Sequence, residues 1–209
     1  MRAGDAGRTR PWFVVVEGLD GAGKSTLVKE LAAAFGAQIL SSSNAISAEV
    51  RAACDGMHGM RGTSRQLFYA YSVSLTSDAA GRALQQGTCV VVDRYWASTI
   101  AYPRVFGDAT DAIEQIATTL LTPTLTLFLD APRAVRAARL EVRGGTPRDI
   151  DAASLERDEA LRAAYMDAFQ APGVVGELEV VDAARGPEEV LERACDAIRR
   201  ITIRGGLVP

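Results

Sequence analysis

Residues 18 to 25 have the residue types and spacing of a polyphosphate-binding loop, with the sequence Gly-Leu-Asp-Gly-Ala-Gly-Lys-Ser. Glycines let backbone N–H groups approach phosphate oxygens, and a helix that follows presents its positive N-terminus to the anion. Lys24 would neutralise the β- and γ-phosphates, and Ser25 would ligate Mg²⁺. The pattern therefore predicts an ATP site with Mg²⁺, formed by Gly18, Gly21, Ala22, Gly23, Lys24, Ser25 and Thr26.

Lys24 is unusual in this chain, because only Lys24 and Lys29 are lysines among the 23 basic residues. A sequence that uses arginine almost everywhere else is expected to keep a lysine for a specific chemical reason. A compact ammonium group beside the phosphates is such a reason.

A second candidate site follows the apolar run that ends at Asp93, which is followed directly by Arg94. The carboxylate of Asp93 suits a hydrated Mg²⁺, and Arg94 suits a second anion, so the pair favours transfer between two phosphates over hydrolysis. The chain has no NKxD-like guanine motif, and no apolar strand ends in the Asp-Glu pair of many hydrolysing ATPases.

Three arginines surround the Gly144-Gly145 pair, which is expected to interrupt a helix. Such a segment, at about residues 143–150, could close over the reacting phosphates, exclude water and bring positive charge to the transferred group. Arg143 and Arg148 are candidate catalytic residues, and Arg139 is a candidate ATP contact.

The elements that would position these residues alternate between short apolar strands and helices. Strands are expected at 12–16, 37–40, 89–93, 125–130 and 178–181, and helices at 25–35, 46–54, 64–84, 111–121, from 132, 150–169 and 187–201. Residues between 95 and 110 are expected to form a loop. This alternation predicts an α/β three-layer sandwich around a parallel sheet of five strands.

Length and composition predict a single domain at 11–204, with flexible segments at 1–10 and 205–209. A formal charge of −3 disfavours a nucleic-acid partner, and no apolar run is long enough for a membrane span. Three scattered cysteines and a single histidine, His58, favour a reducing cytoplasm and make a zinc cluster improbable.

Taken together, the motifs resemble the thymidylate kinase family across most of the chain. The resemblance rests on FVVVEGLDGAGKST at 13–26, DRYWASTIAY at 93–102, the Arg139-Leu140 and Arg143-Gly144 pairs, and the late Val-Asp-Ala turn at 181–183. It implies a P-loop nucleoside monophosphate kinase that acts on small nucleotides, and a homodimer. It also implies that Asp20 holds the sugar 3′-hydroxyl, Asp93 serves Mg²⁺, Arg94 binds the acceptor phosphate, Phe68 stacks on the base, Tyr102 lies against the sugar, and Ala183 flanks the adenine.

Two departures from the family pattern concern the acceptor. Residues 41–45, Ser-Ser-Ser-Asn-Ala, replace an arginine-bearing segment, and Ser72 stands where a base- and phosphate-contacting arginine is expected. Both departures resemble the mitochondrial-type UMP/CMP kinase branch, in which Arg51 would supply the remaining basic group. The acceptor is therefore expected to be dTMP, or alternatively UMP or CMP (or dUMP or dCMP).

Two more distant alternatives remain open. A nucleoside kinase needs a carboxylate base near the 5′-hydroxyl, and Glu17 is the only nearby candidate. A regulator without turnover would bind ATP and transfer no phosphoryl group.

Overall fold

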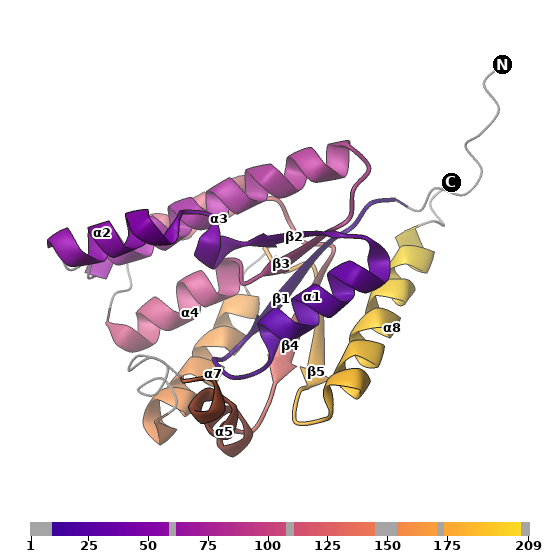
Figure 1. Ribbon diagram of the computed structural model, residues 1–209. Coiled ribbons are helices and arrows are strands. Elements are labelled where there is room, and N and C mark those ends of the chain that lie inside the picture. Colours follow the sequence, from indigo (N-terminus) through magenta and orange to yellow (C-terminus); the bar gives the residue numbers. More distant parts are fainter. Residues whose placement is uncertain (1–9, 59–61, 108–110, 145–153, 171–173, 206–209) are drawn as a thin grey trace.

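The structure, a computed structural model, describes residues 10–58, 62–107, 111–144, 154–170 and 174–205. Within these residues five parallel strands form one sheet in the order β2-β3-β1-β4-β5. The strands are β1 (Phe13–Gly18), β2 (Gln38–Ser41), β3 (Val90–Asp93), β4 (Leu125–Asp130) and β5 (Glu177–Asp182). The helices are α1 (Lys24–Phe35), α2 (Ala48–His58), α3 (Gly62–Gln85), α4 (Trp96–Phe106), α5 (Arg133–Arg143), α7 (Leu155–Phe169) and α8 (Pro187–Gly205) (Figure 1).

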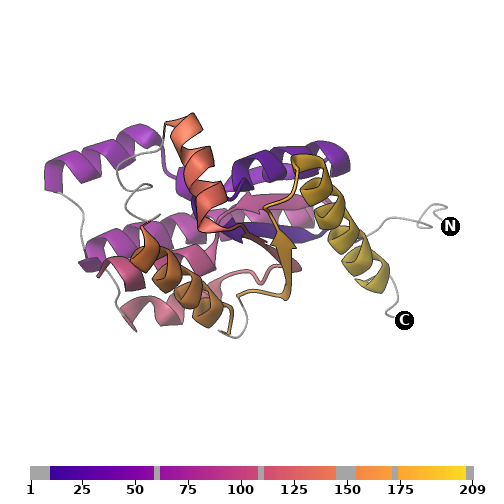
Figure 2. The ribbon, with the colours of Figure 1, turned by 90° about the horizontal axis from the view of Figure 1, so that it is seen from below.

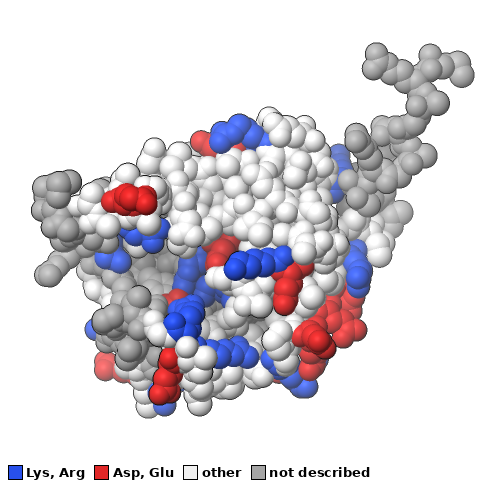
Figure 3. Space-filling model, in the orientation of Figure 1, with Lys and Arg blue, Asp and Glu red and all other residues white. Residues whose placement is uncertain are grey.

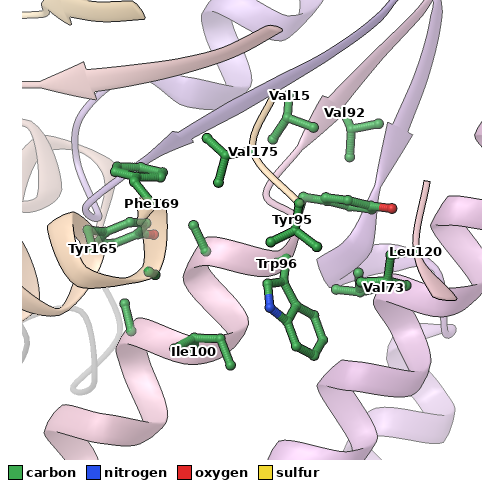
Figure 4. Packing of buried hydrophobic residues seen from close by; sticks show 14 of the residues in the cluster. Val15, Val73, Val92, Tyr95, Trp96, Ile100, Leu120, Tyr165, Phe169 and Val175 are labelled. Atoms are coloured by element: carbon green, nitrogen blue, oxygen red, sulfur yellow. The ribbon is translucent and has the colours of Figure 1, made fainter. Parts of the chain in front are cut away.

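Helices cover both faces of the sheet, with α1 and α8 on one face and α3, α4 and α7 on the other (Figures 1 and 2). The alternation of side chains along β1 separates the two cores. Val14 and Val16 pack with α1 and α8, whereas Phe13 and Val15 pack with the helices of the opposite face. Figure 4 shows the second core, where β1 and β3 meet α4 and α7. The predicted α/β sandwich with a five-stranded parallel sheet is confirmed.

The predicted loop after residue 95 is wrong, because Trp96–Phe106 forms α4. The first six residues of α4 are all buried, so this part of its sequence lacks the apolar and polar periodicity that marks an amphipathic helix. Pro103 inside the helix also argues against a helix from sequence alone. The next predicted helix is a 3₁₀ segment at Asp111–Thr119.

The parallel direction of the strands places the predicted chemistry at one edge of the sheet. β1 and β3 are neighbours, with Val16 opposite Asp93, so the phosphate loop after β1 lies beside Arg94 after β3. This is the crevice at the carboxyl ends of strands in which open α/β sheets bind ligands.

The cysteines and the helices bear on two predictions that were made from composition. Cys89 and Cys195 are free thiols. Among the described residues, no helix has both the length and the apolar character needed to cross a membrane.

Candidate active site

The phosphate loop connects the end of β1 at Gly18 to the start of α1 at Lys24. Lys24 is 7% exposed, and its Nζ donates hydrogen bonds to the backbone oxygens of Gly18 and Leu19, at 2.8 and 2.9 Å. Burial and the nearby Arg94 guanidinium lower the pKa of Lys24 to about 8. The loop thus holds a cation whose charge is destabilised until an anion binds.

Ser25 and Asp93 form the polar pair expected for a metal. The Ser25 hydroxyl donates to Asp93 Oδ2 at 2.8 Å, which joins the first turn of α1 to the end of β3. Hydroxyl and carboxylate oxygens are the donors that Mg²⁺ prefers, and Mg²⁺ commonly takes one or two protein ligands plus substrate phosphates and waters. Within the described residues no group of three or more His, Cys, Asp or Glu could hold a metal alone. The residues fit a Mg²⁺ ion that arrives with a polyphosphate.

Asp20, Arg94 and Tyr102 form a compact cluster beside the loop. Asp20 is ion-paired with Arg94 and accepts a hydrogen bond from the Tyr102 hydroxyl at 2.6 Å. The Arg94 guanidinium also lies 5.1 Å from the Tyr102 ring centroid. Burial favours a raised pKa for Asp20, but Arg94, Lys24 and the Tyr102 hydroxyl outweigh it and lower the pKa to about 2. Asp20 is therefore an anion at neutral pH.

Arg94 has an unusual backbone, with a φ of 64°. It is the only non-glycine residue with positive φ in the described part of the chain. Such a conformation costs about 1–2 kcal/mol for an L-residue, so surrounding contacts must hold it. Its amide donates to Val16 O at 3.1 Å, and its carbonyl accepts from the Ser42 hydroxyl at 2.7 Å.

A cavity of about 500 Å³ opens over the phosphate loop. Its other walls come from the segment after β2, the end of β3, the arginines of α5 and the turn after β5. In the view of Figure 3, basic side chains gather around a hollow at this place. The lining includes Lys24, Arg94, Arg139, Arg143 and Arg185. The cavity has the size and charge of a site for a nucleotide polyphosphate.

Comparison with known proteins agrees with this geometry. Residues 16–194 match the family model described as thymidylate kinase. The chain is 34% identical over 206 residues to a thymidylate kinase of Cereibacter sphaeroides, covering 90% of this chain and 94% of the relative. It is 31% identical over 211 residues to a thymidylate kinase of Thermomicrobium roseum, covering 95% and 99%.

The chain belongs to the thymidylate kinase family. A Bradyrhizobium thymidylate kinase, 32% identical over 211 residues with 92% of both chains covered, supports the same assignment. The predicted resemblance, the P-loop kinase fold and the enzyme class of nucleoside monophosphate kinase are confirmed.

The residues that were predicted to contact the donor nucleotide of a thymidylate kinase lie together. Gly21, Ala22, Gly23, Lys24, Ser25 and Thr26 line the cavity, and so do Arg139, Arg143 and Ala183. Arg139 donates to Ala183 O at 2.9 Å and to Ala22 O at 3.4 Å, so α5 bridges the phosphate loop and the turn after β5. Gly18, the last residue of β1, is absent from the lining of the cavity. Arg148 lies outside the described residues.

The residues that were predicted to bind the acceptor of a thymidylate kinase are more dispersed. Asp20 and Arg94 line the cavity, whereas Arg51, Phe68, Ser72 and Tyr102 are absent from its lining. Ser72 is 2% exposed, and its hydroxyl donates to Phe68 O at 3.2 Å, one turn earlier in α3. The Arg51 guanidinium donates to Ser43 O and to Asn44 Oδ1, on the segment that replaces the family's arginine. Their roles stay predictions.

The Glu17 side chain contacts the start of α4. It is fully buried, and Oε1 accepts from Tyr95 N, Ser98 N and the Ser98 hydroxyl, at 2.8, 3.2 and 3.3 Å. The two amides belong to the N-cap residue and the third residue of α4, so Glu17 of β1 caps that helix. A carboxylate used in this way is poorly placed to act as the base of a nucleoside kinase.

Sequence reasoning missed Arg136 and Asp158, which form a buried ion pair between α5 and α7. A signal was present for Arg136. Arg136, Arg139 and Arg143 are spaced by three and four residues, which places them on one face of a helix. No comparable pattern marks Asp158.

Proposed function

We propose that the protein transfers the γ-phosphoryl group of ATP to dTMP, giving dTDP and ADP. The observation that carries the proposal is that the phosphate loop and the Asp20–Arg94–Tyr102 cluster adjoin in one crevice. A donor polyphosphate on the loop and an acceptor phosphate at Arg94 would then meet head to head. The thymidylate kinases that this chain resembles along most of its length support dTMP as the acceptor.

In this proposal the protein supplies position and charge. An oxygen of the acceptor 5′-phosphate attacks the γ-phosphorus as the bond to the β–γ bridging oxygen breaks, so ADP leaves without a covalent enzyme intermediate. Lys24 and the loop amides hold the donor, and Arg94 holds the acceptor. Arg143 and Arg148 add positive charge to the transferred group. A bound Mg²⁺ would neutralise donor oxygens, with Ser25 and Asp93 nearest to it.

Acceptor recognition in the proposal falls to residues around the cluster. Asp20 holds the sugar 3′-hydroxyl, and Tyr102 lies against the sugar. Phe68 stacks on the base, and Ser72 and Arg51 lie at the margin of the acceptor site. The enzyme acts in the cytoplasm, as its free thiols Cys89 and Cys195 favour. It is a homodimer of single-domain subunits and binds no nucleic acid or membrane.

A second candidate is phosphorylation of UMP or CMP. The contact that favours it is the Ser72 hydroxyl on Phe68 O, because this buried side chain offers no guanidinium to a base. Charged hydrogen bonds contribute about 1.5–3 kcal/mol each, so losing one can change which pyrimidine is read.

ADP release measured with dTMP, dUMP, UMP, CMP, dCMP and thymidine separates these functions. The proposal predicts the highest kcat/KM for dTMP and no turnover of thymidine. Higher values for UMP or CMP would favour the second candidate, and turnover of thymidine would indicate a nucleoside kinase. ATP binding without turnover of any acceptor would indicate a regulator.

A further inference from the structure

Arg136 is a buried arginine that contacts three different elements. Its side chain is 2% exposed. Its Nε donates to Ala131 O at 3.0 Å, one Nη donates to Asp20 O at 3.1 Å, and the other Nη is ion-paired with Asp158. A buried guanidinium is stable only when its charge is paired and its donors are used, and the planar fork of arginine meets all three partners at once.

The contact with Asp20 O constrains the phosphate loop. No peptide bond in the described residues is cis. In a trans peptide the C=O of one residue and the N–H of the next point in opposite directions. With the Asp20 carbonyl directed at Arg136, the Gly21 N–H is directed away from α5, and Gly21 lines the cavity.

The packing of Gly21 reinforces this arrangement. A Cβ added at Gly21 would lie 2.6 Å from Arg136 O and 3.0 Å from Arg136 Cβ. The loop backbone thus lies directly on the first turn of α5, so a displacement of Arg136 would move the loop itself.

Asp158 fixes Arg136 from the other side. It is held at the start of α7, where its amide donates to Ser154 O at 2.9 Å and its carboxylate also lies 3.7 Å from Arg162 Nε. Helix α7 therefore holds the loop peptide through Arg136. Asp158 and Asp20 are more than 130 residues apart in the sequence.

We propose that Arg136, held by Asp158, is a positioning residue that orients the Asp20–Gly21 peptide so that the Gly21 N–H faces the donor phosphates. The inference rests on the proposed use of the loop for ATP. The acceptor side depends on it less, because the Asp20 carboxylate has anchors of its own in Arg94 and Tyr102.

Two variants test the proposal. Arg136→Lys keeps a positive charge for Asp158, but an ammonium cannot reach all three partners of the fork. The double variant R136M/D158L removes the pair and leaves no buried charge unpaired, an exchange that is often neutral for stability. Arg133→Met, an exposed arginine of the same helix, is the matched control.

The probe is tripolyphosphate, which reports on the phosphate cradle without the base or sugar. Calorimetry should show binding of tripolyphosphate weakened about tenfold in both test variants, with Arg133→Met unchanged. Binding of dTMP should stay within about twofold, and melting temperatures identify any variant that does not fold.

Folded Arg136→Lys that binds tripolyphosphate like the wild type would contradict the proposal. Equal losses for tripolyphosphate and dTMP would also contradict it, because they would indicate general deformation of the site. A wild-type protein that binds tripolyphosphate but phosphorylates no acceptor would sink the proposed function, and the comparison of variants would still decide the role of Arg136.

Discussion

Asp20 shows how single residues of this site serve two purposes. It belongs to the phosphate loop, yet its carboxylate is bound by Arg94 and Tyr102, the residues proposed to face the acceptor. Because its pKa is lowered to about 2, the residue keeps its negative charge at neutral pH. In the proposed mechanism, the same short segment contributes backbone to the donor site and a side chain to the acceptor site.

Lys24 should take up a proton when ATP binds at slightly alkaline pH. In the free protein its pKa of about 8 lies below the ordinary 10.5, and the phosphates of ATP favour the charged form. At pH 8, Lys24 should therefore take up about half a proton when ATP binds. Calorimetry in two buffers of different ionisation enthalpy measures this quantity.

The lowered pKa of Lys24 also makes the free energy of unfolding depend on pH. Between pH 8 and 10.5 the folded protein holds fewer protons on Lys24 than the unfolded chain does, so the contribution of Lys24 to the free energy of unfolding rises with pH. Lys29→Met, at an exposed position, should leave the proton uptake unchanged. Absence of uptake at pH 8 in the wild type would show that Lys24 is fully charged before ATP arrives.

Gly21→Ala should destabilise the protein by more than its positive φ alone would cost. Gly21 has a φ of 81°, and Gly87 has a φ of 80° with no atom within 4 Å of an added Cβ. Alanine at either position costs about 1–2 kcal/mol of stability from the backbone. Gly21→Ala should lose more, because its Cβ meets Arg136 O, and should also lose ATP affinity. Urea unfolding of both variants measures the difference.

Equal destabilisation of the two variants would mean that the loop moves away from α5 without cost. That result would also weaken the argument that Arg136 fixes the loop.

At the scale of elements, α4 depends on a contact that no local pattern reveals. Its N-cap residue, Tyr95, makes no side-chain cap, and Glu17 of β1 accepts from the first amides instead. Sequence reasoning considered Glu17 only as a catalytic base, and it missed α4 itself. A cap from a residue 78 positions away is a tertiary contact, and the buried first half of α4 lacks the periodicity from which helices are predicted.

Glu17→Gln should therefore lower stability. The amide oxygen of glutamine can still accept from Tyr95 and Ser98, but the NH₂ replaces Oε2 and cannot accept from the Tyr165 hydroxyl, which lies 3.3 Å from it. The loss should be about 1–3 kcal/mol in urea unfolding. Ser74→Ala, at a half-buried position in α3, offers a control with a small expected effect. A variant that unfolds like the wild type but has lost turnover would instead assign Glu17 to the chemistry.

At the scale of the whole molecule, the parallel sheet assembles the site from distant segments. Every strand was predicted near its observed position. The buried central strands β1, β3 and β4 appear as short apolar runs between turns. The loop and the residues after β3 could be predicted because the carboxyl ends of parallel strands share an edge. The Arg136–Asp158 pair could not, since it depends on how α5 and α7 pack, which neither sequence segment specifies alone.

Transfer of a phosphoryl group from ATP to dTMP in this crevice can be measured from its product. The most direct test is chromatographic measurement of dTDP formed from ATP and dTMP, with UMP and CMP compared in parallel. We predict the highest kcat/KM for dTMP, a loss of about a hundred- to a thousandfold in Lys24→Met, and little change in Lys29→Met. Folded wild-type protein that forms no dTDP, or that prefers UMP or CMP, would contradict the proposed function.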